Sequence, residues 1–248
     1  MEILAVPYHL DERLEGFTVG ERVDREVTAE LPSAGPWQRM AVLYEQVAQA
    51  IAAYAEPVLV VSGDCTTSLG VLAGLQRSGR APGVVWIDAH ADFHTDATTT
   101  SGYLGGMPLA LAAGIGTLTL PTALRLQPVP ESRIVLVDAR DTDPGEHVLL
   151  DRSAVRRAQV ENLDTAALPD GEFYLHVEVD VCNPEEVPEL LYPAPGGPAV
   201  TDVVAAVRRL AATGRVAAVG IAATWRHTSH AASVHQELVR SLHQATMS

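Results

Sequence analysis

Six short apolar runs alternate along the chain with longer segments whose apolar residues recur at helical spacing. The runs are MEILAVPY, VLVVSGD, GVVWIDA, RIVLVDA, FYLHVEVDV and VAAVGIAAT. Runs of this length without regular polar alternation are typical of strands buried on both faces. Residues 37–55 and 199–214, which lie between these runs, have apolar residues at helical spacing. The alternation predicts an α/β protein with three layers, α/β/α, around a mainly parallel central sheet.

Composition limits the classes of partner. No linker, repeat or low-complexity stretch divides the 248 residues, so one domain over 1–248 is expected. With 17 basic and 31 acidic residues, no basic face is expected to bind nucleic acid. An acidic residue follows Met1 at once and no run reaches the length of a membrane span, so we expect a cytoplasmic protein without signal peptide or membrane anchor.

Ligand-type side chains follow the strand predicted in GVVWIDAHADFHT. Asp88, His90 and Asp92 occupy alternate positions, which would place all three on one side of an extended chain. A solvated turn is one interpretation of this segment. Three such groups at the carboxyl end of a buried strand favour a cation site.

A second group repeats the pattern in FYLHVEVDVCNP, where His176, Glu178 and Asp180 alternate with valines. Carboxylates at the end of an apolar strand need a compensating charge, and with few basic residues available a metal is the better partner. Together the two segments offer five ligands: Asp88, His90, Asp92, Glu178 and Asp180. Five ligands, four of them carboxylates, favour two divalent ions.

Cys65 follows the predicted strand VLVVSGD and has two interpretations. A free cysteine at such a position is often a small buried hydrophobe, and it can also be a reactive group or a ligand. Cys182 is expected to be part of the packing. His227, His230 and His235 flank the last predicted helix, where surface or capping roles are expected.

The chain from about residue 58 onward resembles the ureohydrolases, the family of arginase and agmatinase. The resemblance rests on five motifs in the family's order: SGDC (62–65), DAHAD (88–92), TTSGYLGGMP (99–108), RDTDPGEH (140–147) and EVDV (178–181). It implies an arginase-like fold, a small-molecule substrate and two Mn²⁺ per chain.

The resemblance also implies a ligand set. Cys65 stands where the family has a histidine ligand, so it would bind one ion together with Asp88, Asp92 and Glu178. The other ion would have His90 and Asp180, with bridging contacts from Asp88 and Glu178. Glu178 stands where the family usually has the shorter aspartate. Because a thiolate also suits zinc or iron, the identity of the metal stays open.

Substrate contacts follow from the same resemblance. Asp143 and Ser101 correspond to arginase residues that hold the α-amino and α-carboxylate groups of the substrate. His94 stands where arginase has an asparagine, and it can also donate a hydrogen bond. RDTDPGEH further predicts a turn and a helix start at Pro144. An α-amino acid with a guanidine-like tail is therefore favoured over agmatine.

Two departures concern the chemistry. Gly105 stands where arginase has a histidine thought to shuttle protons, and VAAVGIAATWRH (216–227) has no acid where arginase has a glutamate for the guanidinium. The alignment places Ala223 or Trp225 at the glutamate's position. Either the chain is an inactive, metal-binding relative, or its substrate needs neither group.

An N-hydroxyguanidine meets that condition, because its electron-withdrawing hydroxyl leaves it largely neutral near pH 7. Gly105 is expected to leave room for the hydroxyl. The chain thus resembles the ureohydrolases that cleave Nω-hydroxy-L-arginine to hydroxyurea and L-ornithine in D-cycloserine biosynthesis, with Asp92 carrying a proton to the leaving amine. Arginase or another guanidino-acid hydrolase is the alternative. The chain lacks the longer tail of trimeric arginases, so a monomer is expected.

Overall fold

The computed structural model describes residues 1–226 and 232–247. Its main element is an eight-stranded sheet whose paired strands all run parallel. In spatial order the strands are β4 (Arg25–Glu26), β1 (Glu2–Val6), β5 (Val58–Ser62), β10 (Val216–Ala222), β9 (Phe173–Glu178), β6 (Gly83–His90), β7 (Ile134–Asp141) and β8 (Arg156–Ala158). The six strands predicted from apolar runs are confirmed. β4 and β8, at the two edges, were not predicted, and neither was the small antiparallel pair β2 (Tyr8–His9) and β3 (Glu12–Arg13).

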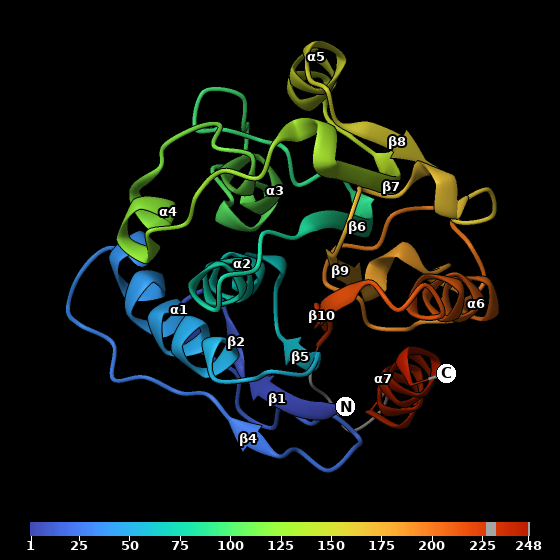
Figure 1. Ribbon diagram of the computed structural model, residues 1–248, viewed down its shortest axis with the longest axis horizontal. Helices are drawn as coiled ribbons and strands as arrows, with labels where there is room; N and C mark the ends of the chain where they lie inside the picture. Colours follow the sequence, from blue (N-terminus) through green and yellow to red (C-terminus); the bar gives the residue numbers. More distant parts are fainter. Residues whose placement is uncertain (227–231, 248) are drawn as a thin grey trace.

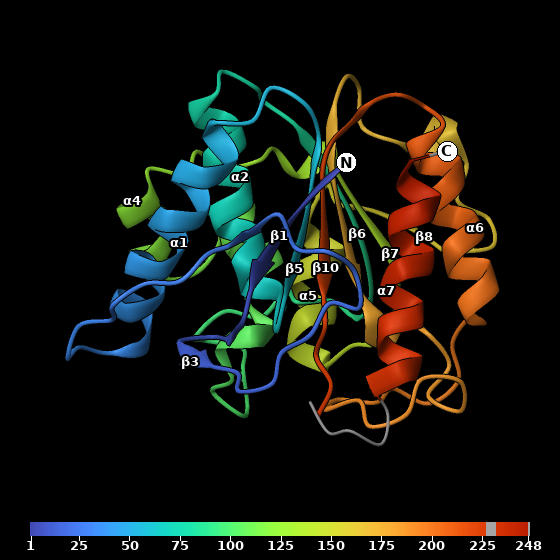
Figure 2. The same cartoon turned by 90° about the horizontal axis from the view of Figure 1, so that it is seen from below.

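Helices cover both faces of the sheet, as Figures 1 and 2 show. One face carries α1 (Pro36–Ala52), α2 (Ser68–Arg77), α3 (Pro108–Ala112) and α4 (Thr119–Leu124), and the other carries α6 (Val200–Ala211) and α7 (Ala232–Thr246). α5 (Pro144–Arg152) lies beside β7 and β8 (Figure 1). The predicted three-layer α/β/α architecture is confirmed, and so are the helix start at Pro144 and the two helices predicted in 37–55 and 199–214.

Two apolar cores explain why the strands lack polar alternation. In β1, Leu4 and Val6 pack into the core under α1 and α2, whereas Ile3 and Ala5 pack into the core under α6 and α7. The six long strands therefore bury both of their faces over most of their length, which is typical of strands in a parallel sheet.

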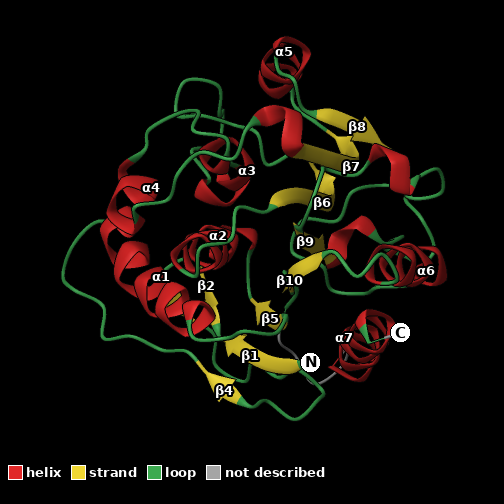
Figure 3. Cartoon of the chain, in the orientation of Figure 1, coloured by secondary structure: helices red, strands yellow, loops and turns green. Residues whose placement is uncertain are grey.

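The order of the strands reverses between β5 and β6, and this reversal leaves a crevice at the carboxyl ends of the strands. The chain passes from β5 to β6, which is not its neighbour, continues outward through β7 and β8, and then fills the gap with β9 and β10 (Figure 3). Open α/β sheets bind ligands at the carboxyl ends of the strands where the order reverses. The segments that carry the predicted ligands all leave the sheet there.

Candidate metal centre and active site

One pocket opens at the carboxyl ends of these strands, and all ten residues predicted for the site line it. They are Cys65, Asp88, His90, Asp92, His94, Ser101, Gly105, Asp143, Glu178 and Asp180. Their individual roles stay predictions. The pocket is also lined by residues that the sequence did not single out: Asp64, Tyr103, Gly106, Asp141, Glu146, Tyr192 and Thr224.

The local backbone differs from the predicted extended chain. β6 ends at His90, and Asp92 reaches the pocket through a left-handed backbone with φ of 52°, a region that aspartate tolerates better than most residues. β9 ends at Glu178, and Asp180 lies in the 3₁₀ turn that follows. Cys65 likewise opens a 3₁₀ turn three residues beyond β5. Strand alternation thus explains the positions of Asp88 and His90. The prediction that Asp92 and Asp180 continue the same extended strands is wrong.

A first ligand group consists of Cys65, Asp88 and Asp92, whose ligand atoms lie within 4.8 Å of one another. The Cys65 Sγ lies 3.8 Å from Asp88 Oδ2. All three side chains are buried, and the Asp92 Oδ2 has no hydrogen-bond partner within the described part of the chain. Burial, reinforced by the charge of Glu178, raises the pKa of the Cys65 thiol. Burial and the charge of Asp88 raise the pKa of Asp92.

A second ligand group consists of Asp88, His90 and Asp180. The His90 Nδ1 lies 3.1 Å from Asp180 Oδ2 and 3.6 Å from Asp88 Oδ1. Burial opposes the charge of the imidazole, but hydrogen bonds to Asp180 and Asp88 raise the pKa of His90 to about 12. Burial, followed by the charge of Asp88, raises the pKa of Asp180 to about 7. Trp86 fixes Asp88, because its Nε1 donates to Asp88 Oδ2 at 3.1 Å.

Glu178 lies beside Cys65 at the carboxyl end of β9. Its Oε2 accepts a hydrogen bond from the Cys65 thiol at 3.0 Å and from the Thr224 hydroxyl at 2.7 Å. Its Oε1 accepts from the backbone N–H of Val179 at 3.1 Å. Burial and the charge of Asp180 raise the pKa of Glu178. Its bridging role between two ions stays a prediction.

These donors fit divalent cations. Several carboxyls and a thiol share a buried space in which each raises the pKa of others, so the cluster holds protons that a cation would displace. The orphaned Asp92 Oδ2 points to the same conclusion, because a buried acceptor without a partner is costly. Shared carboxylates between two groups favour two ions rather than one.

Arg140 holds the turn that carries Asp180. Its guanidinium donates to the backbone carbonyls of Asp180 at 3.2 Å and Val181 at 3.1 Å, and it forms an ion pair with Asp138. It also reaches the carbonyls of Ala194 and Pro195. A planar group with five donors suits this position, so Arg140 fixes a ligand without contacting the pocket.

The predicted substrate-binding residues lie at the outer part of the pocket. The His94 Nε2 lies 3.2 Å from Asp143 Oδ2, and the exposed Ser101 accepts a hydrogen bond from the backbone N–H of Tyr103 at 3.2 Å. Buried Glu146 joins this region to the metal side, because it accepts from the N–H of Phe93 at 2.9 Å and of Asp143 at 3.1 Å. Glu146 was missed, although its place in RDTDPGEH is a sequence signal for helix capping.

The prediction that Gly105 leaves open room is wrong in one respect, because the space beside it holds another side chain. A Cβ at Gly105 would lie 2.4 Å from ring atoms of Tyr103. The Tyr103 hydroxyl lies 3.1 Å from His9 Nε2, and the His9 Nδ1 lies 3.0 Å from the carbonyl of Gly63. Burial, reinforced by the charge of Asp64, raises the pKa of Tyr103. No sequence signal points to His9, which lies in β2.

The end of β10 also differs from the alignment-based prediction. Thr224 lines the pocket, whereas Ala223 and Trp225 are buried in the core under α6 and α7. Trp225 stacks on His235, with ring centroids 4.2 Å apart. His235 is buried, so its predicted surface role is wrong; His227 and His230 lie outside the described residues. The predicted packing role of Cys182 is confirmed by its place in the same core.

Comparison with known proteins agrees with the fold. Residues 5–241 match the model of the arginase family. The chain is 33% identical over 188 residues to an N(omega)-hydroxy-L-arginine amidinohydrolase of Streptomyces lavendulae, an alignment covering 72% of this chain and 66% of that protein. It is 32% identical over 153 residues to an arginase of Bacillus subtilis strain 168, covering 56% of this chain and 51% of that protein. The chain thus spans between half and two thirds of the length of these relatives.

Among solved structures, an arginase of Bacillus subtilis superposes with a TM-score of 0.84 at 21% identity, covering 100% of this chain and 98% of that chain. That likeness concerns the fold. A parallel α/β/α sheet with a carboxylate-rich pocket at its strand ends defines a class of α/β proteins whose strand-end side chains suit divalent cations. Within this class the chain belongs to the arginase family. Among the described residues, no helix is long and apolar enough to cross a membrane.

Proposed function

We propose that this protein is a binuclear amidinohydrolase that cleaves Nω-hydroxy-L-arginine with water to hydroxyurea and L-ornithine. The bond between the guanidino carbon and the side-chain nitrogen of ornithine breaks, and the oxygen of water becomes the carbonyl oxygen of hydroxyurea. Membership of the arginase family supports the reaction class, and the Streptomyces lavendulae relative supports the substrate. Manganese is the metal proposed for the group of hard ligands around His90, on family grounds.

One observation carries the choice of substrate: the end of β10 lines the described pocket with an uncharged residue. The end of β10 presents Thr224, whose hydroxyl is bound to Glu178. Among the other acids of the pocket, Asp64 accepts from the N–H groups of Leu10 and Thr66, and Glu146 accepts from the N–H of Phe93, whereas Asp141 and Asp143 lie at the exposed outer part. A largely neutral hydroxyguanidine does not need an acid at the end of β10.

Different residues of the pocket have different roles in the proposed reaction. Bound divalent cations supply Lewis acidity and lower the pKa of water. Asp92 is positioned to take a proton and pass it to the leaving amine, because it lines the pocket and one of its buried oxygens has no hydrogen-bond partner among the described residues. At the outer part, Asp143 binds the α-amino group, and His94 and Ser101 bind the α-carboxylate.

Tyr103 supplies the contact to the substrate hydroxyl. With His9 Nδ1 donating to the carbonyl of Gly63, the Nε2 is left to accept the phenolic proton of Tyr103. The phenolic oxygen, which also contacts Tyr192, then keeps a lone pair for a donor in the pocket. An N-hydroxyl group is such a donor, and L-arginine lacks it.

The experiment is turnover of the Mn²⁺-loaded protein on Nω-hydroxy-L-arginine and on L-arginine, followed by ornithine release. The expected kcat/KM is about tenfold or more in favour of the hydroxylated substrate, since a polar group left unpaired disfavours the analogue that lacks its partner. A preference for L-arginine would establish the arginase alternative, which the similarity to the Bacillus subtilis arginase supports. Silence on both substrates with metal bound would indicate a non-catalytic relative. The role in D-cycloserine biosynthesis and the monomeric state stay predictions.

A further inference from the structure

His176 is a buried imidazole for which the mechanism above has no use. It lies on β9, is 1% exposed, and points to the same side of the strand as Glu178. Its ring stacks on the indole of Trp86, with centroids 3.7 Å apart. The Nδ1 lies 3.1 Å from the Ser68 hydroxyl, which also lies 2.9 Å from the Tyr174 hydroxyl. The Nε2 has no hydrogen-bond partner among the described residues.

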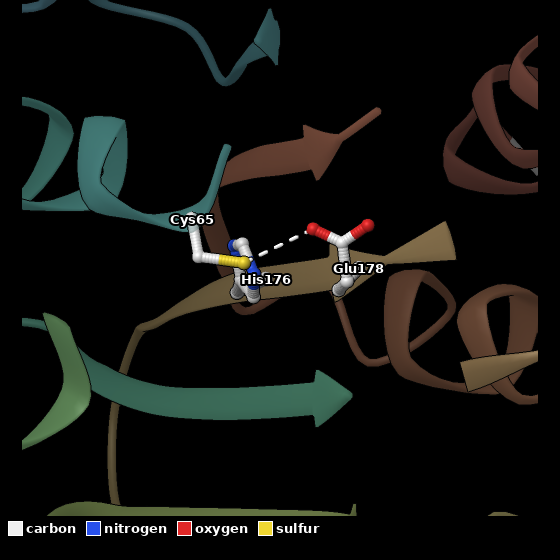
Figure 4. A group of neighbouring side chains, drawn as sticks. All are labelled: Cys65, His176 and Glu178. Atoms are coloured by element: carbon white, nitrogen blue, oxygen red, sulfur yellow. Dashed lines mark hydrogen bonds between the residues drawn. The ribbon is translucent and has the colours of Figure 1, made fainter. Parts of the chain in front are cut away.

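The ring lies against the sulfur side of the metal centre. Cys65, His176 and Glu178 each offer a ligand atom, and these atoms lie within 4.8 Å of one another. Figure 4 shows the Cys65 sulfur in front of the His176 ring, with the Glu178 carboxylate beside it. The sulfur and Glu178 Oε2 are 3.0 Å apart. Ligand atoms of one tetrahedral zinc lie about 3.5 Å apart, given bonds of about 2.0–2.3 Å, so this group needs little movement to enclose an ion.

The surroundings of the imidazole resemble those of a metal ligand. Metal-binding histidines use one ring nitrogen for the metal and the other for a hydrogen bond that fixes the ring. Ser68 and the Trp86 indole fix the ring of His176 in this way. A nitrogen buried without a partner is otherwise costly.

We propose that His176 is a metal ligand, and that Cys65, His176 and Glu178 form a soft-ligand site for a zinc-class ion such as Zn²⁺ or Co²⁺. The group around His90 and Asp180 keeps its carboxylates and one imidazole, a set that suits Mn²⁺. Affinities of such ligands rise from Mn²⁺ toward Zn²⁺, and thiolate favours the softer ions. The sulfur side of the centre therefore prefers a zinc-class ion, and Mn²⁺ occupies it where no softer ion is present. This inference rests on the site of the proposed function and not on its substrate.

The test is binding of Co²⁺ and Zn²⁺ to the metal-free full-length protein. One equivalent of Co²⁺ is expected to give a near-ultraviolet charge-transfer band from thiolate, and a competing chelator measures the Zn²⁺ affinity. His176→Phe keeps the ring stacked on Trp86 but removes the ligand, so the Zn²⁺ affinity falls at least about tenfold. His243→Phe is the matched control, because His243 is also buried with an unpartnered Nε2 but lies on α7, outside the pocket; its Zn²⁺ affinity stays at the wild-type value.

A His176→Phe protein that folds as the wild type does and binds Zn²⁺ equally tightly would overturn the proposal. X-ray absorption of wild-type protein with one equivalent of Zn²⁺ gives an answer even if the variant fails to fold. Sulfur and imidazole in the same shell support the proposal, whereas sulfur without imidazole, or imidazole without sulfur, contradicts it. Neither readout uses turnover, so an absence of activity toward Nω-hydroxy-L-arginine would count against the proposed function alone.

Discussion

The hydrogen bonds of single side chains determine which polar groups of this pocket can contact a substrate. The hydroxyl of Thr224 donates its hydrogen bond to Glu178, and the hydroxyl of Tyr103 donates its hydrogen bond to His9. The Tyr103 oxygen is thereby an acceptor and the wall at Thr224 is uncharged. Both features favour a neutral substrate that donates a hydrogen bond.

Replacing Tyr103 by phenylalanine should lower the preference for the hydroxylated substrate. Loss of one neutral hydrogen bond is worth about 0.5–1.5 kcal/mol, so the ratio of kcat/KM values for Nω-hydroxy-L-arginine and L-arginine should fall by a factor of about 2 to 13. Steady-state kinetics on both substrates measure it. Tyr8→Phe is the control, because Tyr8 is a buried tyrosine that does not line the pocket. An unchanged ratio in Tyr103→Phe would remove this residue from substrate recognition.

Among single residues, the sequence reveals the candidate metal ligands better than the residues that form hydrogen bonds with the pocket side chains. The convergence of Asp88, His90, Asp92, Glu178 and Asp180 could be predicted from strand ends, whereas the place of Cys65 among them followed from the resemblance to the ureohydrolases. His9 meets Tyr103 across 94 positions, and Thr224 meets Glu178 across 46. No local pattern marks such pairs, because only the folded sheet brings them together.

Between elements, Glu146 joins the end of β6 to the start of α5. Its two oxygens serve Phe93, which follows the ligand Asp92, and Asp143, which is expected to bind the α-amino group. Glu146→Ala leaves two backbone donors without their partner, so the free energy of unfolding should fall by about 2–4 kcal/mol. Denaturant titration measures the loss, and KM for the substrate should rise because Asp143 shifts.

Glu146→Gln is the graded control for this prediction, because its carbonyl oxygen can accept from one of the two N–H groups. Its loss of stability should lie between those of the wild type and Glu146→Ala. If both variants unfold at the wild-type denaturant concentration, the link between β6 and α5 does not contribute as described.

Element types were predictable and element ends were not. Continuous burial on both faces leaves a clear apolar signal in the six long strands. β4 and β8 are short edge strands with polar residues, Arg25–Glu26 and Arg156–Ala158, so their pairing carries no such signal. Asp92 and Asp180 fall beyond strand ends, where a left-handed residue and a 3₁₀ turn replace the extended chain.

For the whole molecule, binding of metal should depend on pH. Burial raises the pKa of Asp180 to about 7 and also raises the pKa values of Asp92 and Glu178. In the metal-free protein, these raised pKa values stabilise the fold at low pH, and this stabilisation is lost as the pH rises through the pKa values. Bound cations replace the protons, so stabilisation by metal grows with pH.

The rise in Tm caused by Mn²⁺ should therefore be small near about pH 5.5 and larger near about pH 8, on either side of the Asp180 value. Differential scanning fluorimetry with Mn²⁺ and with chelator measures it. Calorimetry in two buffers of different ionisation enthalpy should show protons released on binding. A metal-induced Tm shift that is the same at both pH values would contradict the description of the cluster.

The proposed hydrolysis is tested most directly by a titration of Mn²⁺ into metal-free protein in the presence of Nω-hydroxy-L-arginine, with hydroxyurea and ornithine both measured. The two products are expected in equal amounts, and full activity is expected to require two cations per chain. Release of ornithine with urea from L-arginine, and no hydroxyurea at any metal loading, would contradict the proposed hydrolysis.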